Sequence, residues 1–179
     1  ARILAAHRGS ATITYDPNLR PSLMPPPEET RPVVERIVAI ADVVKLSDED
    51  LAWLAPDDPL GLAEEWASTG PALVVVTRGA EGALAWTARG ERLEVPPVRV
   101  AVADTVGAGD SFMAGLVDGL WSAGLLGPDA RADLHAVGAD MASIMGGNYP
   151  SGGITLGPGM TFGYIAGRVL AGCAAAEPE

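Results

Sequence analysis

The chain has 179 residues, 48% of them hydrophobic, which is enough apolar material for one well-buried core. Its 23 acidic and 12 basic residues give a net charge of −11, which argues against a nucleic-acid partner because duplex binding needs a basic surface. The single cysteine, Cys173, excludes an intrachain disulfide framework, so a reducing cytoplasm is the expected location. No apolar run approaches the roughly 20 residues of a membrane span, so we expect no membrane partner.

Strands and helices are expected to alternate along the chain. The predicted strands are 11–16, 42–46, 72–77, a run that ends at Thr87, and 92–102. The predicted helices are one over 1–8, then 28–41, 51–54 and 60–68, and others from about Ser111, Pro128 and Thr161. This alternation is typical of βαβ units, so we expect an α/β three-layer sandwich whose mostly parallel sheet is covered on both faces.

Polar segments follow several of the predicted strands. They are 16–20, 45–50, 77–82 and 104–110. In open α/β sheets, ligands bind outside the carboxyl ends of the strands. The sequence therefore predicts that these segments form one site.

The segment 104–112, Asp-Thr-Val-Gly-Ala-Gly-Asp-Ser-Phe, is the most informative of the four. Its glycines and an apolar stretch of helical character predict a turn whose free N–H groups and helix dipole attract an anion. A carboxylate at Asp110 beside a phosphate is costly unless it takes a proton from an attacking hydroxyl, which indicates phosphoryl transfer. The alternative is an ordinary glycine turn before a helix. No Walker loop occurs, and Phe112 stands where a dinucleotide fingerprint has its third glycine.

This segment resembles the C-terminal signature of the PfkB (ribokinase-like) carbohydrate kinases. The resemblance implies that Asp110 is the catalytic base and that Gly107, Ala108 and Gly109 form a backbone anion hole for the transferred phosphoryl group. It implies that Asp104 belongs to a monovalent-cation site. The implied cofactors are ATP and Mg²⁺, with K⁺ as the candidate monovalent cation.

Members of this family are usually longer, and the resemblance covers only their C-terminal part. We therefore expect residues 1–179 to be the C-terminal part of a single kinase domain, without the N-terminal lid half. Family dimers commonly form through the lid, which leaves a homodimer open. The Gly-rich tract 146–153 and the segment 157–159 depart from the family pattern, so adenine and cation ligands are not carried over to them.

Ser47-x-x-Asp50 has the spacing of a helix capping box. It is also similar to the Asn-x-x-Glu region of the family, which implies that Ser47 lies near the phosphates and that Asp50 organises Mg²⁺ indirectly. The version Lys-x-Ser-x-x-acid resembles the fructokinase branch and implies that Lys45 lies near the phosphates. The two interpretations stay open.

The segment 77–82, Thr-Arg-Gly-Ala-Glu-Gly, predicts a tight turn between two strands, with glycine supplying positive φ. In the family the matching Ser/Thr-x-Gly-x-x-Gly lines the nucleotide side of the cleft. The resemblance therefore implies nucleotide contacts from Thr77, Gly79 and Gly82. Both interpretations can hold at once.

The segment 16–21, Asp-Pro-Asn-Leu-Arg-Pro, bears on the substrate. A strand-end Asp-Pro is an ordinary turn signal. The segment is nevertheless similar to fructokinases and less closely to 2-keto-3-deoxygluconate kinases, and the Arg20 guanidinium suits sugar hydroxyls or a sugar-acid carboxylate.

We therefore expect ATP-dependent phosphoryl transfer to a sugar hydroxyl, with fructose as the first choice. The alternatives are a 2-keto-3-deoxygluconate kinase, another PfkB sugar or nucleoside kinase, and a catalytically silent nucleotide-binding fragment or regulatory protein.

Overall fold

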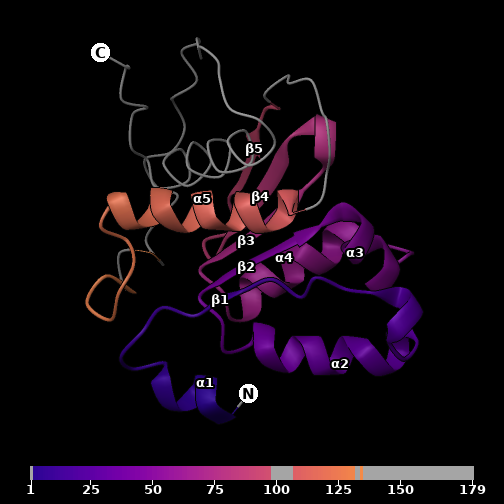
Figure 1. Ribbon diagram of the computed structural model, residues 1–179, viewed down its shortest axis with the longest axis horizontal. Helices are drawn as coiled ribbons and strands as arrows, with labels where there is room; N and C mark the ends of the chain where they lie inside the picture. The colour runs from indigo at the N-terminus through magenta and orange to yellow at the C-terminus, as the bar shows by residue number, and fades with distance from the viewer. Residues whose placement is uncertain (1, 98–106, 132–133, 135–179) are drawn as a thin grey trace.

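The computed structural model describes residues 2–97, 107–131 and 134, and its elements are labelled in Figure 1. The α-helices are α1 Arg2–His7, α2 Pro27–Val38, α3 Asp48–Leu54, α4 Pro59–Thr69 and α5 Ala108–Ser122. The strands are β1 Thr14–Tyr15, β2 Val43–Ser47, β3 Leu73–Thr77, β4 Ala83–Thr87 and β5 Arg92–Val95. Short 3₁₀ turns cover Pro21–Leu23 and Gly79–Glu81.

The strands form one mixed sheet in the order β1-β2-β3-β4-β5. The first three strands are parallel, with Val43 opposite Leu73, and helical crossovers connect them. Strands β4 and β5 continue the sheet in antiparallel fashion, because the connections before them are too short for a crossover helix. The α/β class is therefore confirmed, and the parallel arrangement belongs to the half of the sheet formed by β1, β2 and β3.

Helices cover both faces of the sheet, as a three-layer sandwich requires. Figure 1 shows α5 on one side of the sheet and α2 on the other. Side chains alternate along each strand. Val44 and Val74 pack in the cluster that includes α2, α3 and α4, whereas Val43 and Val75 pack in the cluster that includes α5. The sheet is thereby buried on both faces.

Several boundaries differ from the sequence prediction. Helix α5 begins at Ala108, three residues before the predicted Ser111, so Asp110 lies in its first turn. The first predicted strand shrinks to Thr14–Tyr15, and β5 ends at Val95, just before two prolines that cannot donate to a strand ladder. Residues 128–130 form a turn, and helical backbone appears at Arg131. Asp104, the tracts 146–153 and 157–159, and the helix predicted from Thr161 lie outside the described residues.

A buried ion pair fixes the edge of the sheet at which the parallel strands begin. Asp42, which precedes β2, is fully buried and accepts hydrogen bonds from Arg131 Nε at 2.8 Å and Arg131 Nη2 at 2.9 Å. The same carboxylate accepts the backbone N–H of Ile13 at 2.8 Å. Arg131 also donates to the carbonyls of Arg8 and Ala11. These contacts, here called the Asp42–Arg131 clasp, join the segment after α5 to the segment before β1.

Across the described residues, none of the helices combines the length and apolarity needed to cross a bilayer.

Candidate functional site

A pocket of about 470 Å³ lies at the carboxyl ends of the parallel strands. Four stretches of chain line it: the loop after β1, the end of β2 with the start of α3, the end of β3, and the start of α5. The lining residues are Asp16, Asn18, Leu19, Arg20, Pro21, Lys45, Ser47, Glu49, Asp50, Thr77, Gly107, Gly109 and Asp110. Each polar segment singled out in the sequence therefore contributes at least one residue.

Helix α5 points its first turn at this pocket. Gly107, the N-cap, has φ +74°, a left-handed conformation that glycine adopts without steric strain. The first N–H groups of a helix have no intrahelical acceptor, and the dipole places roughly half a positive charge at this end. Gly107, Gly109 and the exposed Asp110 line the pocket, whereas Ala108 is not among its lining residues. The arrangement suits an anion beside a carboxylate.

Lys45 supplies a buried positive charge next to this turn. It is the only lysine in the sequence, it lies in β2, and it is 3% exposed. Its Nζ donates to Asp16 Oδ2 at 2.8 Å. A Cβ placed on Gly109 would lie 2.9 Å from the same Nζ, so the ammonium packs directly against the beginning of α5.

The capping interpretation of Ser47 is confirmed. Its Oγ accepts the backbone N–H of Asp50 at 3.0 Å and caps α3. Ser47, Glu49 and Asp50 all line the pocket, so capping does not remove this turn from the site. Glu49 was missed in the sequence, although its position in the first turn of the same helix was a usable signal.

The loop after β1 is shaped by its own hydrogen bonds. Asp16 Oδ1 accepts the N–H of Asn18 at 3.2 Å, and Asn18 has φ +43°. Arg20 Nη1 donates to the carbonyls of Leu19 at 2.8 Å and Asn18 at 3.4 Å. The exposed Arg20 guanidinium is thus held at the rim of the pocket with part of its donor capacity used by the backbone.

The turn at 78–82 has the predicted glycine geometry. Gly79 has φ +52° and Gly82 has φ +89°, and the N–H of Arg78 bonds the carbonyl of Gly82 at 2.8 Å. A Cβ on Gly82 would lie 2.1 Å from the carbonyl oxygen of Val95, so this position packs directly on backbone. Thr77 lines the pocket and the two glycines do not, so their nucleotide contacts stay a prediction.

Carboxylates outnumber cations around the pocket. Asp16, Glu49, Asp50 and Asp110 face Lys45 and Arg20. Burial, and to a smaller extent the negative charge of Asp16, raise the pKa of the neighbouring Tyr15. Within the described part of the chain, no three metal-ligating side chains gather into a ready-made metal site. Any cation held here would need further oxygen ligands, such as phosphates.

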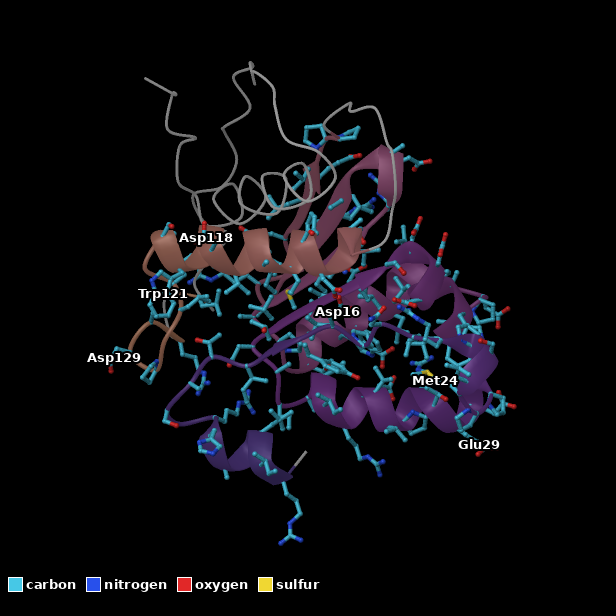
Figure 2. All side chains as sticks on the ribbon, in the orientation of Figure 1. Asp16, Met24, Glu29, Asp118, Trp121 and Asp129 are labelled. Carbon is cyan, nitrogen blue, oxygen red and sulfur yellow. The ribbon has the colours of Figure 1, made fainter. Side chains whose placement is uncertain are left out.

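Figure 2 shows Asp16 below the N-terminal end of α5, and Asp118 and Trp121 near the opposite end of that helix. The site therefore occupies one end of α5 only. Asp16 belongs to the polar segment 16–20 that was predicted to join the site, but no role was assigned to its side chain; its strand-end position beside Lys45 was the signal that could have given one.

Comparison with known proteins identifies sequences and structures that are similar to this chain. Residues 1–144 match the family described as pfkB family carbohydrate kinase. A fructokinase of Rhizobium leguminosarum bv. trifolii is 42% identical over 119 residues, which are 66% of this chain and 36% of the relative. A fructokinase of Klebsiella pneumoniae is 38% identical over 144 residues, which are 79% of this chain and 45% of the relative.

Solved kinase structures are also similar to this chain. Aminoimidazole riboside kinase from Salmonella enterica, complexed with aminoimidazole riboside and an ATP analog, superposes with a TM-score of 0.56 at 30% identity, covering 75% of this chain and 47% of that chain. A fructokinase double mutant from Vibrio cholerae O395, in fructose-, ADP- and potassium-bound form, gives a TM-score of 0.52 at 34% identity and covers 75% and 45%. The chain thus spans less than half the length of these relatives.

Proposed function

Because the chain belongs to the pfkB family of carbohydrate kinases, we propose that the protein transfers the γ-phosphoryl group of ATP to a hydroxyl of a sugar, with fructose as the first candidate. One observation carries the proposal. The first turn of α5, the Asp110 carboxylate and the buried Lys45 ammonium border the same pocket. That set combines an anion site with a proton acceptor, as phosphoryl transfer requires.

In this proposal Asp110 takes the proton of the acceptor hydroxyl. The hydroxyl oxygen forms its bond to the γ-phosphorus as the bond to the bridging oxygen breaks, and ADP leaves with that oxygen. The backbone N–H groups at 107–110 and the helix dipole stabilise the charge on the transferred group. Lys45 adds a full positive charge next to them, in a position where water is largely excluded.

The lining residues fit a phosphate-bound magnesium ion. Mg²⁺ commonly takes one or two carboxylates together with waters and substrate phosphates. Asp50 and Glu49 offer carboxylates on the pocket wall, and Asp50 is the residue we propose to hold the ion indirectly. When bound, the ion neutralises phosphate charge. The monovalent-cation role proposed for Asp104 concerns a residue outside the described ones.

The charges of the pocket favour a neutral sugar over a sugar acid. Lys45 is already paired with Asp16, and Arg20 spends donor capacity on its own loop. A substrate carboxylate would therefore meet four protein carboxylates with few free cations. Fructose avoids that repulsion, so we place it ahead of 2-keto-3-deoxygluconate.

Three further proposals concern the domain organisation, the oligomeric state and the location of the protein. A single kinase domain, a homodimer and a cytoplasmic location remain proposals, the last from the lone Cys173. A catalytically silent member of the family is the rival in another class. The acidic Asp110 in the first turn of α5 favours activity over silence.

The test is sugar-dependent ADP release by the full-length protein. The panel holds fructose, ribose, 2-keto-3-deoxygluconate and adenosine with Mg-ATP and K⁺, for wild type and Asp110→Asn. We expect turnover on fructose that falls by at least about 10²–10⁴-fold in the variant, while nucleotide binding is retained. Silence of the wild type on every acceptor would support the silent alternative. Full activity of Asp110→Asn would show that Asp110 is not the catalytic base.

A further inference from the structure

The position of Lys45 needs an explanation, because lysine is rarely buried unless it is paired. The residue is 3% exposed, and its ammonium touches the beginning of α5, whose dipole is positive at that end. Both desolvation and the dipole oppose a positive charge there. The carboxylate of Asp16, with its Oδ2 at 2.8 Å from Nζ, supplies the opposing charge that keeps the ammonium in place.

Strand register places these two residues side by side. Tyr15 lies opposite Val44 in the parallel pair of β1 and β2, so Asp16 and Lys45 are the next residues along the two strands. Asp16 is held at both oxygens, because Oδ1 accepts the N–H of Asn18 at 3.2 Å while Oδ2 binds Lys45. A carboxylate fixed at two points holds its partner in one geometry. Asp16 therefore links the loop that carries Arg20 to the charge beside α5.

We propose that Asp16 is a positioning residue for phosphoryl transfer: it holds the Lys45 ammonium over the first turn of α5, where the transferred phosphoryl group is stabilised. The inference rests on the proposed kinase function. Asp16 does not itself exchange a proton or form a bond in this role. It acts through Lys45, and its effect should disappear when Lys45 can no longer carry a charge.

The pairing of Asp16 with Lys45 should also weaken the binding of the nucleotide. Asp16 competes with the phosphates for the Lys45 ammonium and also repels them, since its side chain lines the same pocket. Removing the charge of Asp16 should therefore tighten the binding of ADP while it slows the chemical step. A residue that only supports the fold would weaken both together, so the opposite signs identify a positioning role.

The kinetic experiment compares wild type with Asp16→Asn, which keeps the size of the side chain and removes its charge. We expect kcat to fall by about 10²-fold, the loss that a small misplacement of a reacting or stabilising group can cause, with KM for ATP unchanged or lower. Asp118→Asn is the matched control, because it makes the same charge change at an exposed position toward the other end of α5 (Figure 2) and should keep wild-type kcat. A kcat within two-fold of wild type in Asp16→Asn would overturn the proposal.

A double-mutant cycle with Lys45→Met decides how Asp16 acts. If Asp16 works through Lys45, adding Asp16→Asn to Lys45→Met should change kcat less than about two-fold. An undiminished loss in that background would mean that Asp16 acts directly on substrate, which contradicts the proposal. A drop in kcat that follows a loss of folded protein, measured by thermal unfolding of each variant, would contradict it as well.

The affinity for Mg-ADP, measured by calorimetry, tests the positioning role of Asp16 separately from the proposed kinase function. We expect Asp16→Asn to bind ADP about five-fold more tightly, as removal of one nearby like charge predicts, and Lys45→Met to abolish the gain. A wild type that turns over no sugar would refute the kinase proposal, and the binding comparison would still test the placement of Asp16. Unchanged or weaker binding in Asp16→Asn would overturn the inference in an active protein.

Discussion

The Lys45 ammonium fills the space in which a side chain at position 109 would begin, since a Cβ built on Gly109 would lie 2.9 Å from Nζ. The lack of a side chain at position 109 therefore leaves room for the Lys45 ammonium. Only the flexible end of Lys45 crowds the position, so a methyl group can be accommodated by moving that end. The pair offers a way to displace the ammonium slightly without changing any charge.

Gly109→Ala should fold and lose activity. Alanine is favoured over glycine inside a helix by roughly 0.5–1 kcal/mol, which offsets the crowding. The displaced ammonium should lower kcat about ten-fold, less than the roughly 10²-fold loss of a 1 Å misplacement. Steady-state kinetics and thermal unfolding check this. Gly9→Ala is the control, since a Cβ there meets no atom within 4 Å. Wild-type kcat in Gly109→Ala would contradict the expectation.

The two glycines of the 78–82 turn should respond differently to alanine. Both have positive φ, which costs an L-residue roughly 1–2 kcal/mol. A Cβ on Gly79 meets nothing within 4 Å, whereas one on Gly82 would lie 2.1 Å from the Val95 carbonyl oxygen. We expect Gly79→Ala to lose only the strain energy and Gly82→Ala to lose about 3 kcal/mol or more, because overpacking adds roughly 1–3 kcal/mol. Urea unfolding of both variants measures the difference, and equal losses would show that the backbone at Val95 gives way.

Arg131→Met should destabilise the protein strongly. It leaves the fully buried Asp42 carboxylate without its cation, a change that typically costs about 3–5 kcal/mol. The Arg131 side chain is 24% exposed, so the lower end of that range is expected. Adding Asp42→Asn should restore part of the loss, because an amide oxygen can still accept the Ile13 N–H without an uncompensated charge. Chemical unfolding of the single and double variants checks this, and a double variant less stable than Arg131→Met would contradict it.

Alkaline pH should weaken the fold through Tyr15. Burial first, and the charge of Asp16 second, raise the pKa of its phenol from 10.0. The folded state then holds the phenolic proton more tightly than the unfolded state does, so this contribution to stability is complete below about pH 10 and is lost as the pH rises through the folded pKa. Tyr15→Phe should therefore lose less stability than wild type as the pH rises from about 9.5 through the folded pKa. Urea unfolding across that range measures it, and parallel curves would show that Tyr15 contributes nothing.

Much of the site was predictable because its parts are local. The ends of β2 and β3 are marked by polar residues, and parallel strands end at the same edge, so the placement of Ser47 and Thr77 around one pocket follows from the parallel pairing alone. Asp110 was predicted from the glycine turn before it and from the resemblance to the family signature. The cap formed by Ser47 depends on only four consecutive residues. The α/β class follows from the same alternation of elements.

The structural features that the sequence did not predict depend on which residues lie next to one another in the folded protein. The short extent of β1 and β5 depends on ladder partners that a hydrophobic run does not specify. The start of α5 at Ala108 depends on the left-handed Gly107, which local propensity does not fix. The pairing of Asp16 with Lys45, 29 residues apart, follows from register, which the sequence pattern does not reveal.

The clasp between Asp42 and Arg131 also sets an order of events in folding. Arg131 holds the carbonyl of Ala11, which lies 120 residues earlier in the chain, and contacts of such long range form slowly because a large loop must close first. Strands β2 and β3 can pair as soon as the helices between them form, but the segment before β1 has to wait until Arg131 has emerged from the ribosome. The segment before β1 is thus among the last of the described segments to be secured, and in hydrogen exchange its amides should open first.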